Sequence, residues 1–300
     1  MKKGLAYVSL FMSVLMFFIF WNRPNWATAL TVFPSWIWLT FWLFALPAKK
    51  QKVFIFATVG WVLFGLFQVE EWQSMLRSLR PVEVVEDDLR ISTINCSGSN
   101  KALLDAFAEE PDVILVKESP SREFIEGLIN EKEGYAYLYG FDTSIIVRGE
   151  ISGLKNERIY IAGDAIIDTK RYIIVSLRLL TSNPRVDLYR LDCWQSQTFM
   201  RKRQTEQLTE IVNLLPQDVA CIVGGDFNVP QRDKVFSYMR EGMVDSFSSG
   251  GRGWCNTILV DVPLLRIDQI WTSSELSCFD AYARESEGTD HRLYTASMKK

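Results

Sequence analysis

The chain has 300 residues, of which 48% are hydrophobic, and its formal net charge is −3 at pH 7. Residues 1–69 contain no Asp or Glu and carry six Lys or Arg, which leaves residues 70–300 with a formal net charge of −9. The length suits one sizeable domain plus a smaller part. An acidic domain argues against tight non-specific binding of nucleic acid, because that binding depends on Lys and Arg contacts to phosphates.

Three uncharged apolar runs lie in the first 69 residues, at residues 4–21, 26–46 and 53–69. A spanning helix needs about 20 mostly apolar residues, within a range of about 17–25. A signal peptide would account for the first run alone and not for three in succession. The sequence therefore predicts a transmembrane anchor of three helices over residues 1–69.

The basic residues of the loops predict how this anchor is oriented. Five lysines precede the first run or separate the second from the third, and only Arg23 lies between the first two. Because short cytoplasmic loops are enriched in Lys and Arg, the N-terminus is predicted to be cytoplasmic. The chain then leaves the third span on the outer side, so we expect an integral protein of the plasma or inner membrane with an extracytoplasmic domain.

Residues 70–88 are predicted to join the anchor to that domain. Trp72, Met75, Leu76 and Leu79 recur at helical spacing over residues 70–80. Such a helix can lie in the membrane interface or pack between anchor and domain, and the pattern fits both. Pro81 ends it, and residues 82–88 are predicted to form a linker.

Residues 89–300 alternate between predicted strands and helices, which is typical of a layered α/β sandwich. Helices are expected at residues 101–110, 121–130 and 200–215. Strands are expected at residues 90–95, 112–117, 136–139, 144–147, 159–161, 165–168, 172–178, 220–223, 269–272 and 293–298. The five cysteines include no CxxC pair, so we expect buried thiols rather than structural zinc, although an extracytoplasmic location would favour one disulfide.

Polar residues follow or interrupt several of these strands, where a rigid sheet commonly presents catalytic groups. They are Asn95, Glu118, Asp226, Asn228, Asp268 and the pair Asp290-His291. Carboxylate and amide oxygens suit a hard cation such as Mg²⁺. His291 is the only histidine in the chain. A single histidine is more often structural, but a histidine oriented by a carboxylate is a common general base at neutral pH.

Five segments, in order INCSG, VILVKES, VGGDFNVP, LRIDQIW and GTDHRL, resemble the motif series of the endonuclease/exonuclease/phosphatase superfamily. The resemblance covers about residues 89–298. It implies a four-layered α/β/β/α sandwich of the DNase I-like type over residues 89–300. It also implies hydrolysis of a phosphate ester with Mg²⁺ or Mn²⁺ as cofactor.

The resemblance implies a role for each matching residue. Glu118 would be the main metal ligand, with Asn95 and Asp290 near the metal. Asp226 would position or activate the attacking water, and Asn228 would hold the scissile phosphate.

The histidine would act at the phosphate as base or electrostatic stabiliser, with Asp268 orienting it. Two departures matter. Lys117 stands where the family usually has Gln, and Arg178 stands where many members have a second catalytic His. Guanidinium does not lose its proton, so Arg178 cannot be a general base, but it can bind a phosphate oxygen.

The leading hypothesis is therefore a membrane-anchored, metal-dependent phosphodiesterase whose substrate is nucleic acid, a phospholipid or a small molecule. The alternative is an impaired family member that binds a phosphorylated ligand or a protein partner. Arg178 and Lys117 motivate this alternative. A transporter is disfavoured, because the predicted spans contain no acidic residue.

Overall fold

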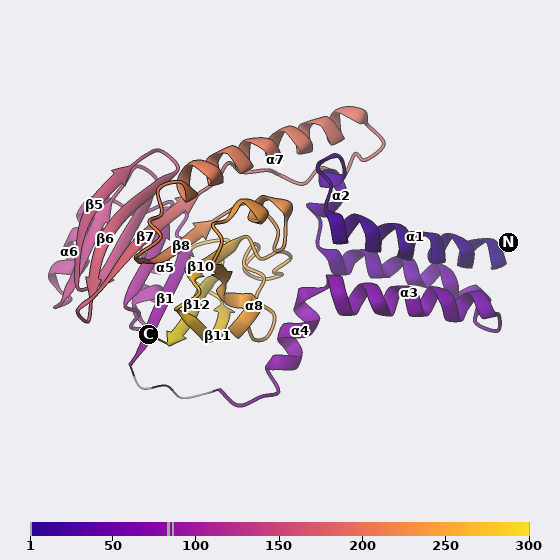
Figure 1. The fold of residues 1–300 in the computed structure, drawn as a ribbon, viewed down its shortest axis with the longest axis horizontal. Coiled ribbons are helices and arrows are strands. Elements are labelled where there is room, and N and C mark those ends of the chain that lie inside the picture. The colour runs from indigo at the N-terminus through magenta and orange to yellow at the C-terminus, as the bar shows by residue number, and fades with distance from the viewer. Residues whose placement is uncertain (1, 83–84, 86, 300) are drawn as a thin grey trace.

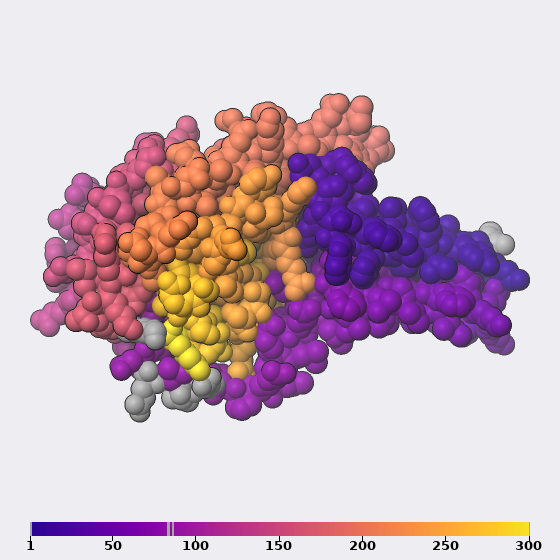
Figure 2. Space-filling view, in the orientation of Figure 1, coloured from indigo at the N-terminus to yellow at the C-terminus, as the bar shows by residue number. Residues whose placement is uncertain are grey.

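In the computed structural model, which describes residues 2–82, 85 and 87–299, a bundle of apolar helices lies beside a two-sheet domain (Figures 1 and 2). The bundle contains α1 (Lys2–Asn22), η1 (Asn25–Ala27), α2 (Thr28–Thr31), η2 (Ser35–Ala48) and α3 (Lys52–Gln68). It extends away from the domain, which meets the bundle at α2 and α4 (Glu70–Arg77) (Figure 1).

Among the residues that the structure describes, α1 alone is by itself long and apolar enough to cross a membrane. Residues 25–31 and 35–48 are long and apolar enough only when taken together, and the chain bends by 75° between them. The same holds for α3 with α4, where the bend is 68°. The second predicted span is thus not one α-helix. Pro34 precedes η2, and a proline lacks the N–H that would continue the helical hydrogen bonding.

The bundle helices pack closely. Trp61 Nε1 donates a hydrogen bond to Ser9 Oγ at 3.1 Å, and Trp42 Nε1 donates to Thr58 Oγ1 at 3.0 Å. Gly60 faces Ser13 so closely that a Cβ would lie 2.3 Å from the serine oxygen. Large apolar side chains on the outward faces are exposed; they include Phe11, Phe18, Ile55 and Phe56. Such a surface suits contact with lipid.

The helix predicted after the anchor is α4, and its polar side binds the domain. Ser74 Oγ donates to the carbonyl of Gly253 at 2.7 Å, and Arg77 Nε donates to the carbonyl of Gly251 at 2.6 Å. Trp72, Met75 and Leu76 remain exposed on its other side. The linker expected at residues 82–88 lies partly outside the described residues.

The domain contains two six-stranded sheets. The first has the order β11-β12-β1-β2-β4-β3 and the second β5-β6-β7-β8-β10-β9. The strands of the first sheet are β1 (Asp88–Asn95), β2 (Val113–Lys117), β3 (Tyr135–Tyr139), β4 (Thr143–Arg148), β11 (Ser277–Arg284) and β12 (Leu293–Lys299). Those of the second are β5 (Glu150–Asn156), β6 (Tyr160–Ile167), β7 (Lys170–Arg178), β8 (Ala220–Asp226), β9 (Met243–Asp245) and β10 (Asp268–Ser273).

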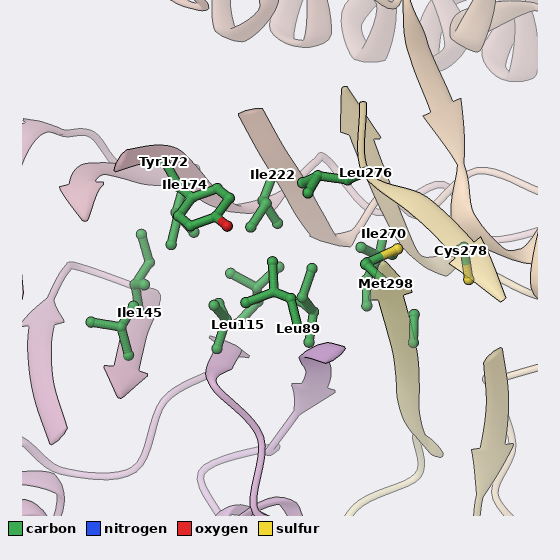
Figure 3. Packing of buried hydrophobic residues seen from close by; sticks show 14 of the residues in the cluster. Leu89, Leu115, Ile145, Tyr172, Ile174, Ile222, Ile270, Leu276, Cys278 and Met298 are labelled. Carbon is green, nitrogen blue, oxygen red and sulfur yellow. The ribbon is translucent and has the colours of Figure 1, made fainter. Parts of the chain in front are cut away.

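The sheets pack face to face around a buried apolar cluster that includes Leu115, Ile145, Ile174 and Ile222 (Figure 3). The helices α5 (Asn100–Phe107) and α6 (Arg122–Asn130) cover the outer face of the first sheet. The outer face of the second sheet packs against α7 (Leu191–Val212) and η3 (Lys234–Tyr238). This mixed α/β arrangement agrees with the predicted order of layers.

Several element boundaries differ from those predicted. Residues 159–161 and 165–168 belong to one strand, β6, and α7 begins at Leu191 rather than near residue 200. The strands β5, β9 and β11 and the short helix α8 (Ser246–Gly250) were not predicted. β5 is mostly exposed at the edge of its sheet, so it lacks the apolar alternation that marks a buried strand. All five cysteines are buried and free, as expected.

Candidate active site

The pairing of four central strands brings the predicted site residues together. β1 runs parallel to β2, and β7 runs parallel to β8. Asn95 and Lys117 are paired at the ends of the first two strands, and Arg178 and Asp226 at the ends of the other two. Asp268 begins the antiparallel strand β10 directly opposite Asp226. Residues from distant parts of the sequence therefore meet at one end of both sheets.

Asn95 links two of the predicted carboxylates. Its Nδ2 donates to Glu118 Oε1 at 2.9 Å and lies 3.3 Å from Asp226 Oδ2. Its Oδ1 accepts from the backbone N–H of Ser97 at 3.0 Å, which fixes the orientation of the amide. Glu118 directly follows β2 with a φ of 43°, so the chain turns there and its carboxylate stays half-exposed.

Asp226 is almost completely buried, and Oδ1 accepts from the backbone N–H of Asn228 at 3.0 Å. Burial, together with the neighbouring carboxylate of Asp268, raises the pKa of Asp226 to about 6. A carboxylate with a pKa this close to neutrality can accept a proton from water more readily than an ordinary aspartate.

His291 and Asp268 form a buried pair, with His291 Nδ1 2.7 Å from Asp268 Oδ2. The hydroxyl of Thr257 accepts from the backbone N–H of Asp268 at 3.0 Å and so holds the start of β10. Burial lowers the pKa of His291, but the contact with Asp268 outweighs that effect and raises it to about 9. His291 is therefore a cation at neutral pH in this state, with Nε2 as its remaining donor.

Lys117 lies beneath this pair and is completely buried. Its Nζ contacts Thr93 Oγ1 and lies 3.5 Å from Asp268 Oδ1. Burial lowers the pKa of Lys117, while the carboxylates of Asp268 and Asp226 oppose that shift. Where the resemblance implies Gln, this chain places a lysine whose amine lies 3.5 Å from the carboxylate behind His291.

Arg178 bridges three carboxylates. Its Nη2 lies 2.7 Å from Glu118 Oε1, its Nη1 2.9 Å from Asp142 Oδ2, and its Nε 3.9 Å from Asp226 Oδ2. Asp142 had not been singled out in the sequence. Antiparallel pairing of β2 with β4 sets Thr143 opposite Lys117 and so brings Asp142 near Glu118, which required the strand register to be known.

The remaining predicted residues stand at the rim of the site. Asn228 has a φ of 52°, and its Nδ2 donates one hydrogen bond to the carbonyl of Leu179 at 3.0 Å. An Asn side-chain amide has two N–H groups, so one remains for a ligand. Asp290 is exposed, and its Oδ1 accepts from Ser97 Oγ at 3.1 Å.

A pocket of about 610 Å³ opens onto these side chains. Its polar wall contains Glu118, Arg178, Asp226, Asn228, Asp290 and His291. Its lining also includes Val32, Phe33 and Pro34 from the bundle, together with Ile258 and Leu259. The contribution of the bundle was not predicted, because no local pattern links residues 32–34 to the catalytic motifs.

The side-chain oxygens at the site are of the chemical type that binds a divalent cation, but they are not arranged as metal ligands are. Asn95 and Glu118 present side-chain oxygens of the kind that Mg²⁺ prefers, and Ser97 joins Asn95 to Asp290. Within residues 2–82, 85 and 87–299, however, no three His, Cys, Asp or Glu side chains converge as metal ligands do. The guanidinium of Arg178 contacts Glu118, the residue that the resemblance makes the main ligand.

The site thus places a buried acid–imidazole pair and a second buried carboxylate at the end of a two-sheet sandwich. The sequence model of the Endonuclease/Exonuclease/phosphatase family matches residues 92–291, about two thirds of the chain. The chain belongs to this family, and membership supports a hydrolase that acts on phosphate esters. No curated protein sequence matches the chain.

Solved structures show the same fold. TDP2 from D. rerio, complexed with a single strand DNA product, is 16% identical, with a TM-score of 0.54 over 72% of this chain and 100% of that one. An endonuclease/exonuclease/phosphatase from Beutenbergia cavernae is 13% identical, with a TM-score of 0.55 over 71% and 72%. A mannosyl-6-phosphatase from Bacteroides thetaiotaomicron is 13% identical, with a TM-score of 0.50 over 71% and 100%.

Proposed function

We propose that the protein is a membrane-anchored phosphoesterase that hydrolyses a phosphodiester at the outer face of the membrane. The observation that carries this proposal is the meeting of Asp226 with the Asp268–His291 pair at the floor of one pocket. The proposal divides the chain into an anchor of three membrane crossings (1–69), a junction (70–88) and a catalytic domain (89–300). It places the N-terminus in the cytoplasm, following the distribution of Lys and Arg.

In this proposal Asp226 positions the attacking water and accepts its proton. Asn228 donates its free N–H to a phosphate oxygen. His291, held by Asp268 through Nδ1, donates from Nε2 to the charge that develops on the phosphoryl group. Arg178 adds a second donor to the phosphate.

A divalent cation, Mg²⁺ or Mn²⁺, would be held by Glu118, Asn95 and Asp290, and when bound it would offset negative charge on the phosphoryl oxygens. The remaining catalytic contribution is positioning, which the rigid strand ends supply to Asp226 and Asp268. The family relationship and the oxygen donors support this assignment.

A second function is favoured by one observation, the contact between Arg178 and Glu118. If that contact persists in solution, the domain would bind a phosphorylated ligand or a protein partner and turn nothing over. Metal affinity without hydrolysis would support this alternative.

The test uses the full-length protein in detergent beside Asp226→Ala. Bis-p-nitrophenyl phosphate, plasmid DNA and a phospholipid panel are each offered with Mg²⁺, Mn²⁺ or EDTA. We expect hydrolysis that needs the cation and is lost in the variant. Equal rates for the two proteins would refute the assigned site, and a folded wild type that hydrolyses nothing would favour the ligand-binding alternative.

A further inference from the structure

One wall of the candidate active site is made by the membrane bundle. Val32, Phe33 and Pro34, between α2 and η2, line the same pocket as Asp226 and His291. Pocket residues from the loop before β10 extend this apolar surface; they are Ile258, Leu259, Leu264, Leu265 and Ile267. The pocket is therefore divided into a charged floor and an apolar side.

The apolar side lies where the bundle and the domain are fixed to each other. Arg23, directly after α1, donates to the carbonyl of Gln231 at 2.7 Å, and Thr198 of α7 donates to the carbonyl of Asn25 at 2.9 Å. At the end of α3, the carbonyl of Phe67 accepts a hydrogen bond from Arg232 at 3.0 Å. The domain thus sits against the ends of α1 and α3 (Figures 1 and 2).

This placement puts the pocket at the surface of any membrane that α1 crosses, because Val32–Pro34 follow α1 by about ten residues. Apolar side chains that line the pocket are also exposed: Val186 is 82% exposed and Leu259 is 46% exposed. Exposed apolar residues around a polar site are typical of surfaces that meet lipid or another apolar partner.

The charges of the pocket argue against a polymeric nucleic acid. Among the described residues that line it, Arg178 is the one Lys or Arg. A nucleic acid would carry further phosphates into the apolar side, whose described lining residues include no Lys or Arg. A single phosphate ester with an apolar chain would instead match both halves of the pocket.

From this arrangement we infer that the substrate is a lipid phosphate ester of the membrane. Its phosphate lies over Asp226 and His291, and the first part of its chain lies against Phe33 and Leu259. This inference rests on the proposed phosphoesterase function and adds the class of substrate to it.

The test uses the full-length protein in nanodiscs and p-nitrophenyl phosphodiesters whose second ester is ethyl, octyl or hexadecyl. These probes share one leaving group and differ only in the apolar chain. We expect kcat/KM to rise at least about tenfold from ethyl to hexadecyl, because each buried methylene favours binding. In Phe33→Ala and Val186→Ser the ratio of the hexadecyl to the ethyl value should fall severalfold.

Val186 is so exposed that its substitution does not threaten folding, and Leu154→Ser, at an apolar site on β5 that is also exposed and lies outside the pocket, is the control. The control should keep the wild-type ratio. A wild type that cleaves all three probes equally, or that prefers single-stranded DNA to the hexadecyl probe, would overturn the lipid inference and leave the phosphoesterase proposal intact. Failure to cleave any probe, with a wild type no different from Asp226→Ala, would overturn both.

Discussion

Two of the buried groups of charged side chains in the described residues differ in what they contact. In the proposed assignment the catalytic cluster consists of Lys117, Asp226, Asp268 and His291, and the junction cluster consists of Glu70, Asp245 and Arg266. In the junction cluster Arg266 donates to both oxygens of Asp245, at 2.7 and 3.0 Å, and to Glu70 at 3.0 Å. This cluster joins α4, which follows the apolar bundle, to the domain.

Burial and shifted pKa values occur in both clusters, so neither feature alone identifies the active site. Burial raises the pKa of Asp245 as it raises that of Asp226. The difference lies in access: Asp226 and His291 line the pocket, and the junction cluster is absent from the described residues that line it. A perturbed carboxylate indicates catalysis only where a substrate can reach it.

The largest expected effect tests this distinction with a matched pair of substitutions, Asp226→Asn and Asp245→Asn. Asp226→Asn should lower kcat by about 10³-fold, since it removes the residue that accepts the proton of the attacking water. The kcat of Asp245→Asn per folded molecule should stay within about threefold of the wild-type value, because this substitution affects stability and not chemistry. Rates are measured on bis-p-nitrophenyl phosphate, with the folded fraction measured by circular dichroism. Similar losses in both variants would mean that the two clusters do not differ in this way.

The junction cluster should dominate stability instead. Arg266→Met leaves Glu70 and Asp245 buried without their partner, which should cost about 3–5 kcal/mol. The measurement is the free energy of urea unfolding in detergent. Arg203→Met is the control, because the exposed pair between Arg203 and Glu206 contributes no more than about 1 kcal/mol. An unchanged stability of Arg266→Met would show that the junction does not depend on this cluster.

The contrast also shows what the sequence could predict. Short motifs beside apolar strands predicted Asp226, Asp268 and His291 as site residues, and the structure brings these three side chains together. Strand ends in one sheet lie close together, and the pattern of apolar residues locates those ends.

The junction cluster and the apolar side of the pocket had no such signal. Glu70 meets Arg266 across 196 positions of sequence, and Phe33 reaches the pocket only because the helix breaks at Pro34. The apolar run at residues 26–46 reads as one continuous helix. Pro34 marks a break in this run, but the packing of α2 against α7, which fixes how the two parts lie, is not contained in a local pattern.

The charge of the catalytic cluster can be measured directly, since His291 is the only histidine. Its imidazole NMR signal in EDTA should titrate with a midpoint near 9. Because this folded pKa exceeds the ordinary value of about 6.5, the stability it contributes is complete below pH 6.5 and is lost as pH rises through about 9.

Asp268→Asn should lower that midpoint by about two units, since it removes the carboxylate that holds the proton. Asp164→Asn, which removes a partly buried carboxylate from β6 in the second sheet, should leave the midpoint unchanged. A wild-type midpoint near 6.5 would contradict the cationic state assigned to His291 and would return it to the role of general base.

The smallest effect concerns Arg178, whose guanidinium contacts the carboxylate that a divalent cation would use. A bound cation and Arg178 therefore compete for Glu118. Arg178→His removes the competing positive charge and should tighten Mn²⁺ binding about tenfold, as the loss of one opposing charge at a half-exposed site predicts. Isothermal titration and the electron paramagnetic resonance spectrum of Mn²⁺ both measure this without turnover.

Arg171→Gln is the matched control, because Arg171 lies on the same strand, β7, but pairs with Asp164 on the surface. It should bind Mn²⁺ as the wild type does. If Arg178→His binds Mn²⁺ no more tightly than the wild type does, the cation displaces Arg178 from Glu118 with no loss of affinity. Arg178 would then be assigned to binding the substrate phosphate. If the variant binds more tightly and turns over faster, the ion pair between Arg178 and Glu118 restrains the site and must open before the site can act.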